Sequence, residues 1–323
     1  MSLSSVLRKL VIIFCPIFVA ILVSLSQKYE DLGYSAGRLP SPSMDGHISE
    51  DQMLRYKDDG YLLFKGLVTD DSLSKLQLSS KKVAKTFFWT DWMFGKFYHK
   101  ISMQAWKTKR DIAQFALESN LGHLAAQLLE ETSSIRILKD AVFLHSPTAG
   151  EGCGYHLDDR AFWPASDSGL TFWVALSPMR IEEGGGIRLA KGSHTADWAL
   201  HCREAIQNDT CHMKIVSPEC HNQMNEVSVT FDMDPGDTLV WDRKIFHRSD
   251  EFYLPTEEEK LRYSIRYVSS KAKAMGFHHP SVTTGEKLDG SHYPQVWPMP
   301  IPEEIEGFSQ FGSSFLARFL PFY

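Results

Sequence analysis

A histidine and an aspartate stand two residues apart, at His156 and Asp158, in the glycine-rich segment GCGYHLDD. On an extended strand such residues point to the same face, so an imidazole and a carboxylate at this spacing can bind one metal ion side by side. They would supply two corners of a facial triad of two histidines and one carboxylate. The pair by itself is equally compatible with a structural role.

A second histidine that could complete the triad follows a strand-like segment further along the chain. In PGDTLVWDRKIFHRSD, residues 235–237 predict a tight turn and residues 238–241 predict a buried strand, after which the chain reaches His247. Most of the other histidines lie in polar, loop-like segments, where solvated side chains are expected.

Two arginines share one face of the strand-like segment LRYSIRYV, because Arg262 and Arg266 are four residues apart. A core strand seldom carries inward-facing arginines without an anion to meet them. A guanidinium beside a metal site can bind a carboxylate of a dicarboxylate cosubstrate through two hydrogen bonds. The alternative is a half-exposed strand whose arginines face water.

The elements that would position these residues are strands preceded by helices. Helical spacing extends from Asp70 to Thr86 and from Asp111 to Glu131. From about Ile135 onward, short β-branched and aromatic runs alternate with Gly, Pro and Asp turns. These runs are Lys139 to His145, Leu170 to Leu176, Val227 to Phe231, Asp237 to Trp241 and Arg262 to Val268. The sequence therefore predicts a mainly β fold with N-terminal helices, in the α+β class.

The N-terminal segment indicates targeting to a membrane. Arg8 and Lys9 precede an uncharged apolar run from Leu10 to Ser26. The run is at the lower limit for crossing about 30 Å of hydrocarbon and slightly long for a cleavable signal peptide. We expect residues 1–26 to be an uncleaved signal anchor, with the body in the lumen of the endoplasmic reticulum or Golgi. The alternative is a signal peptide and a secreted protein.

The rest of the chain divides into three predicted parts. Residues 27–47 are rich in Ser, Gly and Pro and predict a stalk, residues 48–270 predict the folded domain, and residues 271–323 a C-terminal extension that packs on it. A glycosylation sequon at Asn208 and cysteines at 202, 211 and 220 suit an oxidising compartment. A disulfide among these cysteines is feasible, but the spacing does not choose the pair.

Composition excludes several classes of function. With 323 residues, 43% of them hydrophobic, the chain can fill one large core or two modest ones. Its formal net charge of −6 offers no basic excess for phosphates, so nucleic acid is not an expected partner. The chain also lacks the phosphate-binding, nucleophilic-serine and zinc-protease motifs.

The order of these motifs resembles the phytanoyl-CoA dioxygenase family of Fe(II)/2-oxoglutarate-dependent oxygenases. The resemblance extends from about Gln52 to Val268, through DGYLLFKGLV, GYHLDDRAFW, TFWVALSPMRIEEGGGIRLAKGSH, PGDTLVWDRKIFHRSD and LRYSIRYV. It implies a double-stranded β-helix, which is a jelly-roll barrel of the cupin type with iron held at its mouth.

Carried over position by position, the resemblance implies that His156, Asp158 and His247 bind iron. It implies that Arg262 holds the C5 carboxylate of 2-oxoglutarate.

Three further residues follow from the same comparison. Trp173 and Ser249 match positions that line the cosubstrate pocket. Because the insert at 256–260 lengthens the interval before Arg262, Arg266 is an alternative holder of 2-oxoglutarate.

The resemblance implies a dioxygenase that uses Fe(II), 2-oxoglutarate and O2 to hydroxylate a small-molecule or lipid-like substrate, with release of succinate. Asp158 favours hydroxylation, because family relatives that halogenate leave out this carboxylate to make room for chloride. Two alternatives remain open: a non-catalytic binding protein on the same barrel, and a cupin metal enzyme that does not use 2-oxoglutarate.

Overall fold

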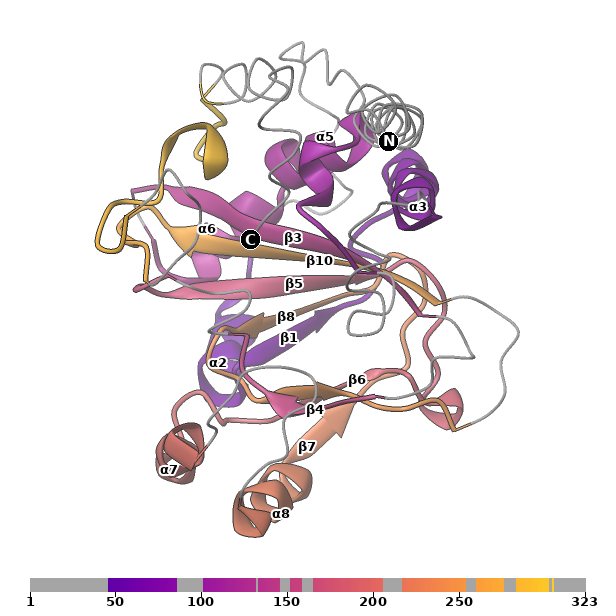
Figure 1. Cartoon of the computed structure of the whole chain (residues 1–323), viewed down its shortest axis with the longest axis vertical. Coiled ribbons are helices and arrows are strands. Elements are labelled where there is room, and N and C mark those ends of the chain that lie inside the picture. The colour runs from indigo at the N-terminus through magenta and orange to yellow at the C-terminus, as the bar shows by residue number, and fades with distance from the viewer. Residues whose placement is uncertain are drawn as a thin grey trace, which may run out of the picture.

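The chain was analysed as a computed structural model, which describes residues 46–85, 101–131, 133–145, 152–158, 165–205, 217–253, 260–275, 283–301 and 304. Within these ranges the chain forms two facing β-sheets with helices on their outer sides (Figure 1). The large sheet consists, in order, of β1 (Tyr61–Phe64), β8 (Thr238–Asp242), β5 (Gly169–Ala175), β10 (Lys260–Ser269), β3 (Ile135–His145) and β11 (Gln295–Trp297), with β2 (Ile101–Met103) also paired with β3. The small sheet consists of β4 (Cys153–His156), β9 (His247–Ser249), β6 (Ile187–Ala190) and β7 (Ser228–Thr230).

From β3 to β10 the chain passes back and forth between the two sheets. Strands β3, β5, β8 and β10 belong to the large sheet, whereas β4, β6, β7 and β9 belong to the small sheet, and neighbouring strands are antiparallel. This alternation is the topology of a double-stranded β-helix, so the predicted mainly β fold is confirmed. Every strand-like run expected from the sequence coincides with a strand of the structure.

The helices cover the outer faces of the sheets. They are α2 (Glu50–Asp59), α3 (Asp70–Lys85), α5 (Arg110–Glu118), α6 (Leu121–Leu128), α7 (Asp197–Ala205) and α8 (Pro218–Glu226). In Figure 1, α3 and α5 lie above the large sheet and α7 and α8 below the small one. Short 3-10 turns occupy Ala105–Lys107, Ile181–Glu183 and Gly290–His292.

The main hydrophobic core lies between these N-terminal helices and the large sheet. It joins Leu76 of α3, Phe115 of α5 and Leu124 of α6 to the outward-facing residues of β10, which include Tyr263 and Tyr267. Because strand residues alternate between faces, Arg262, Ser264 and Arg266 of β10 face the other sheet. The strand is fully buried, so the half-exposed alternative for LRYSIRYV is excluded.

One predicted helix is interrupted. The sequence predicts a single helix from Asp111 to Glu131, but the structure has α5 and α6, separated at Ser119 and Asn120. Ser119 is extended, with φ −69° and ψ 163°. Ser and Asn side chains compete for backbone hydrogen bonds and so favour helix ends, a local effect that the apolar spacing conceals.

The prediction of a membrane protein requires correction. Across the described residues, no helix combines the length and the apolarity needed to cross a bilayer. This finding contradicts the signal anchor, the single-pass membrane placement and the luminal location predicted from the sequence. The segment 1–26 on which those predictions rested lies outside the described residues, as do residues 27–45 and Asn208.

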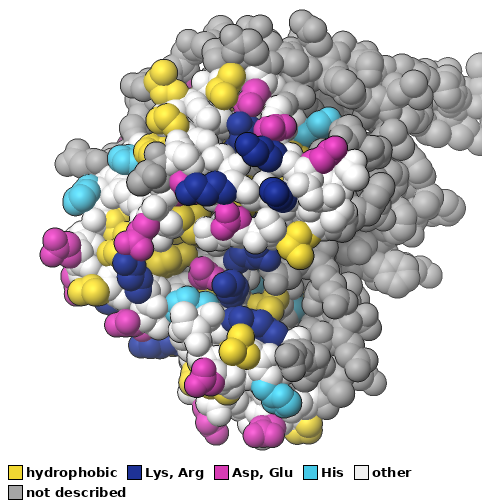
Figure 2. All heavy atoms as spheres, turned by 90° about the vertical axis from the view of Figure 1, so that its left-hand side faces the viewer, with side chains coloured by type: hydrophobic (Ala, Val, Ile, Leu, Met, Phe, Trp, Pro, Cys, Tyr) yellow, Lys and Arg dark blue, Asp and Glu magenta, His cyan; other side chains and the backbone are white. Residues whose placement is uncertain are grey.

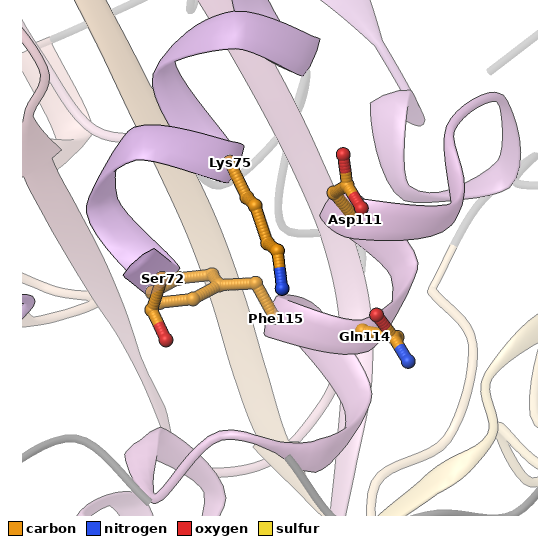
Figure 3. A pocket seen from close by; sticks show the side chains of 5 residues that line it. All are labelled: Ser72, Lys75, Asp111, Gln114 and Phe115. Atoms are coloured by element: carbon orange, nitrogen blue, oxygen red, sulfur yellow. The ribbon is translucent and has the colours of Figure 1, made fainter. Parts of the chain in front are cut away.

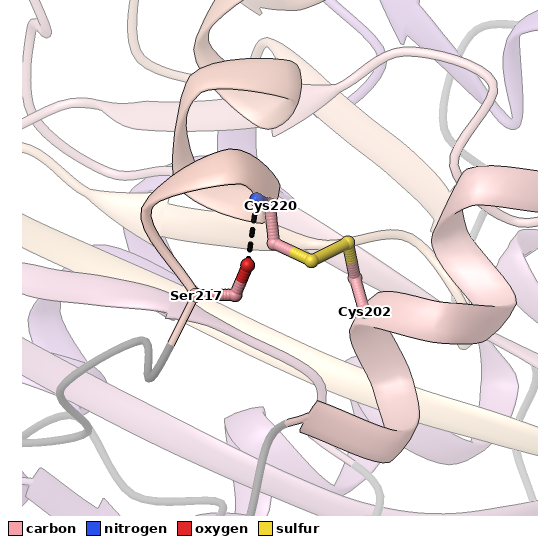
Figure 4. The surroundings of a disulfide bond; sticks show 3 residues. All are labelled: Cys202, Ser217 and Cys220. Carbon is pink, nitrogen blue, oxygen red and sulfur yellow. Dashed lines mark hydrogen bonds between the residues drawn. A yellow bond between two sulfur atoms is a disulfide. The ribbon is translucent and has the colours of Figure 1, made fainter.

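The cysteine pair that the spacing left open is resolved by the tertiary structure. A disulfide joins Cys202 of α7 to Cys220 of α8 (Figure 4). Ser217 caps α8 by accepting a hydrogen bond from the backbone N–H of Cys220 at 3.3 Å. Both cysteines belong to a hydrophobic cluster that also contains Tyr155 and Phe246, so the disulfide fixes the two helices against the outside of the small sheet.

The surface carries mixed charges. Figure 2 shows acidic and basic side chains interspersed on one face of the molecule, with hydrophobic side chains between them. The large hydrophobic side chains that remain exposed in the described ranges are Leu54, Leu78, Ile181, Leu200, Tyr253, Met275 and Met299.

Candidate metal centre and its surroundings

The structure brings the three predicted metal ligands together inside the barrel. His156 ends β4 and His247 begins β9, and the antiparallel pairing of these strands places the two histidines opposite each other. The loop after β4 then carries Asp158 between them. Its Oδ1 lies 3.6 Å from Nε2 of His156 and 3.5 Å from Nε2 of His247. All three side chains are buried, and their ligand atoms lie within 4.8 Å of one another.

Both histidines are oriented by backbone carbonyl groups. Nδ1 of His156 lies 2.8 Å from the carbonyl oxygen of Gly154, and Nδ1 of His247 lies 3.1 Å from that of Ile245. A carbonyl only accepts, so Nδ1 of each neutral ring carries the proton and donates it there. The lone pair of Nε2 is then directed at the space beside Asp158, which is the usual arrangement of histidine metal ligands.

The charges in this cluster suit a divalent metal ion. Burial by itself raises the pKa of the Asp158 carboxyl, but the Arg266 guanidinium and the neighbouring His247 hold that pKa well below its usual value. The pKa of His247 is lowered by burial and by the adjacent His156. Near neutral pH the cluster therefore presents a carboxylate at Asp158 and an unprotonated imidazole at His247, the protonation states that metal binding requires. This donor set fits non-haem iron(II).

Arg262 is a buried guanidinium next to an aromatic ring. Only 1% of the residue is exposed, and its Cζ lies 5.1 Å from the ring centre of Trp173 on β5. Among the described residues, neither its Nε nor its Nη2 has a hydrogen-bond partner. Burial lowers its pKa to about 9. An isolated buried cation is costly, so this site is suited to an incoming anion.

Arg266, the alternative partner for the cosubstrate, has a different environment. Its Nη2 and Nε donate hydrogen bonds to Oδ2 of Asp158 at 2.7 and 3.1 Å. The two arginines therefore lie on the same face of β10 but differ in their contacts: Arg266 contacts the candidate metal ligand Asp158, whereas Nε and Nη2 of Arg262 have no partner among the described residues.

Ser249 lies two residues after His247 on β9, so strand alternation places both on one face. It is half-buried and pairs in register with Ile187 of β6. Its expected place in the lining of the cosubstrate pocket stays a prediction.

Sequence reasoning missed Lys139 of β3, which lies opposite Arg266 in the pairing of β3 with β10. Lys139 is 2% exposed, and its pKa is lowered to about 8 by burial, by Arg266 and by Lys107. The signal available in the sequence was a lysine within the apolar run ILKDAVFL. In the structure this lysine lies on the same face of the large sheet as the two arginines. Ser264 and Thr171 also have buried hydroxyl oxygens without a hydrogen-bond partner in the described part of the chain.

A small hollow on the helical side is separate from this cluster. It lies between α3 and α5 and is lined by Ser72, Lys75, Asp111, Gln114 and Phe115 (Figure 3). Its volume of about 10 Å³ admits at most one water molecule. The large sheet separates it from the histidines, so it takes no part in the metal centre.

Comparison with known proteins agrees with this geometry. The model of the family Phytanoyl-CoA dioxygenase (PhyH) matches residues 56–252, which include all three candidate metal ligands. No curated protein matches the chain in sequence.

Solved structures share the fold at low sequence identity. The alpha-ketoglutarate-dependent carbocyclase SnoK from nogalamycin biosynthesis is 15% identical, with a TM-score of 0.61, and the match covers 79% of this chain and 99% of SnoK. The epimerase SnoN in complex with Fe3+, alpha ketoglutarate and nogalamycin RO is 20% identical, with a TM-score of 0.59 and coverage of 76% and 98%. EctD from S. alaskensis, with 2-oxoglutarate and 5-hydroxyectoine, is 14% identical, with a TM-score of 0.56 and coverage of 82% and 91%.

Proposed function

Since the chain belongs to the phytanoyl-CoA dioxygenase family of non-haem iron- and 2-oxoglutarate-dependent oxygenases, we propose that it hydroxylates a small-molecule or lipid-like substrate. The observation that carries the proposal is the combination of the His156, Asp158 and His247 cluster with a buried arginine of the facing large sheet, whose Nε and Nη2 have no hydrogen-bond partner among the described residues. A structural ion-pair network would leave no such cation without a partner.

The three clustered residues would hold iron(II). Two imidazole nitrogens and one carboxylate oxygen would bind the ion and would leave positions on it for a chelating cosubstrate and for O2. When bound, the iron would allow O2 to act as the oxidant and 2-oxoglutarate as the electron donor: one oxygen atom of O2 would enter a substrate C–H bond, and the other would enter succinate as 2-oxoglutarate loses CO2.

Arg262 would hold the carboxylate of 2-oxoglutarate that is remote from the metal. Its Nε and Nη2 have no hydrogen-bond partner among the described residues, whereas Nε and Nη2 of Arg266 already donate to Asp158. Trp173 covers one face of the guanidinium and restricts its orientation. Ser249 and Ser264 would line the same pocket and contribute hydroxyl groups.

The barrel itself would keep water from the reacting atoms. Apolar side chains of both sheets, including Leu189, Leu239 and Trp241, form a buried cluster between the two sheets. Exclusion of water strengthens the electrostatic contacts of the bound anion and limits unproductive side reactions.

Anaerobic titration of the protein with Fe(II) and 2-oxoglutarate tests this proposal through the weak visible charge-transfer band of the chelate. We expect the band in the wild type, its loss in His156→Ala, and a requirement for about 100-fold more 2-oxoglutarate in Arg262→Met, because a desolvated charged contact is removed. Arg55→Met removes an exposed arginine of α2 and should behave as wild type.

Absence of the band from iron-loaded wild type would overturn the assignment. Where the band is present, candidate substrates are examined for succinate release coupled to a product that has gained one oxygen atom. Succinate release with a rearranged, unoxygenated product would contradict hydroxylation while leaving the cofactors in place.

A further inference from the structure

The carboxylate of Asp158 faces two different partners. Its Oδ1 is directed to the two histidine Nε2 atoms, at 3.6 and 3.5 Å. Its Oδ2 accepts two hydrogen bonds from Arg266, at 2.7 and 3.1 Å. Both side chains are almost fully buried, 4% exposed for the aspartate and 3% for the arginine. Water therefore does not compete for Oδ2.

The number of oxygens that Asp158 gives to the metal decides what else can bind. A carboxylate binds a metal ion through one oxygen or through both, and each bound oxygen fills one position of an octahedral ion. With both bound, the two histidines leave two positions, enough for a chelating keto acid or for O2, but not for both. With one bound, three positions remain.

We propose that Arg266 is a positioning residue that keeps Asp158 bound to the metal through Oδ1 alone. The inference rests on the proposed function, since the open positions matter only if a chelating cosubstrate and O2 must bind together. Two donors in the plane of the guanidinium hold Oδ2 away from the metal side, and this geometry is available to arginine but not to lysine.

The strand pairing supports this assignment independently. Arg266 pairs with Lys139, but the next residue, Tyr267, pairs with Ile137, so that β3 contains one extra residue, Leu138, at this point. Such β-bulges re-aim side chains and are frequent beside active sites. The irregularity of β10 against β3 falls at Arg266, where the strand passes Asp158.

Stability alone does not account for the contact. A buried ion pair usually contributes no more to stability than well-packed apolar side chains of similar volume. Arg262, on the same strand and face, shows that this barrel also holds an arginine that contacts no described carboxylate. The contact of Arg266 with Asp158 is therefore best explained by what it does to the carboxylate.

Cobalt(II), used alone as the metal probe, tests the proposal without turnover. The cobalt-loaded protein is titrated with oxalate, which needs two adjacent positions but no remote arginine, and with azide, which needs one. We expect Arg266→Met to bind cobalt at least as tightly as wild type and to bind azide similarly. We expect it to lose 2-oxoglutarate and oxalate affinity by about tenfold or more, since displacing one aspartate oxygen opposes chelation.

Arg262→Met is the matched control from the same strand. It should lose 2-oxoglutarate affinity but bind oxalate as wild type does, because only the remote carboxylate is affected. Arg266→Lys, which keeps the charge, should bind azide as wild type does and should recover oxalate binding only in part. If Arg266→Met does not fold, the same titrations are made with Arg266→Gln. This variant retains one donor, so its loss of oxalate affinity should be smaller.

The outcomes separate this inference from the proposed function. Wild type that binds neither cobalt nor 2-oxoglutarate contradicts the function itself. If the wild-type protein binds both, and the Arg266 variants have oxalate affinities within twofold of the wild-type value, the positioning role is overturned. The proposed function is then left intact. An equal loss of azide and oxalate would show that Arg266 acts through charge alone and would likewise overturn the proposal.

Discussion

At the scale of single residues, the surroundings of a charged group decide what it can do. Arg262 and Arg266 are the same residue type on one face of one strand, yet one has an aspartate partner and the other has none in the described structure. Lys139 adds a third buried cation to this part of the barrel. Cations outnumber the one clustered carboxylate, Asp158, so the site favours anionic ligands.

Lys139 gives a prediction about pH. Its pKa falls from 10.5 to about 8 in the folded protein, chiefly through burial. Between these values the unfolded chain binds more protons, so the free energy of unfolding of the metal-free protein increases as pH rises through this window. The contribution is at most about 3 kcal/mol. Lys139→Met should be more stable than wild type at pH 7 and lose this part of the pH dependence.

Urea unfolding of wild type and Lys139→Met at several pH values between 7 and 10 measures the difference. Arg262 has a lowered pKa in both proteins and therefore cancels in the comparison. Lys81→Met, which changes an exposed lysine of α3, is the control and should follow wild type. Parallel pH profiles for wild type and Lys139→Met would contradict the prediction.

At the scale of the elements, turns set the register that brings the ligands together. The turn before β8 contains Gly236, with a φ of +94°, where a Cβ would collide with the carbonyl oxygen of Val68. Asp237 follows and accepts hydrogen bonds from the backbone N–H groups of Gly66 and Asp234 and from the Lys65 ammonium. This turn therefore fixes β8 against the segment after β1, and β8 leads to His247.

Gly236→Ala tests how far this turn constrains the sheet. We expect the free energy of unfolding to fall by about 3 kcal/mol or more, because the left-handed backbone and the collision act together. Gly285→Ala is a close control: its φ is +92°, but no atom lies within 4 Å of the new Cβ. It should cost only about 1 kcal/mol. Thermal or urea unfolding measures both variants. If Gly236→Ala and Gly285→Ala lose the same free energy of unfolding, the contact with Val68 is unimportant.

At the scale of the whole molecule, the large sheet separates the main hydrophobic core from the candidate site. On one face it packs against the N-terminal helices through the main hydrophobic core, and on the other it carries the arginines of the candidate site. The apolar cluster between the sheets is smaller and includes Trp173. The main core and the arginines of the candidate site therefore lie on opposite faces of the same strand, β10.

Leu124→Ala on α6 tests this separation. The side chain is fully buried in the helix-facing core, so its truncation should lower the free energy of unfolding by about 2–5 kcal/mol. The cobalt affinity of the folded variant should stay within twofold of wild type, since no metal-binding residue faces this core. Leu54→Ala, at an exposed position of α2, should change stability by less than about 0.5 kcal/mol. A selective loss of cobalt affinity in folded Leu124→Ala would contradict the separation.

The sequence by itself determined the fold class, the positions of β3, β5, β7, β8 and β10, and the three residues that cluster as candidate metal ligands. These follow from local patterns, because alternation along a strand is fixed by the backbone and places His156 or Arg262 on a definite face. The break between α5 and α6 was also local, but apolar spacing concealed it.

The tertiary structure alone decided which arginine contacts Asp158 and which cysteines pair. Arg266 and Asp158 are 108 residues apart, and their contact depends on the register of β10 and on the bulge opposite it. No local pattern encodes that register. For the same reason Lys139 was read as part of an apolar strand, since its proximity to the site arises only when β3 and β10 pair.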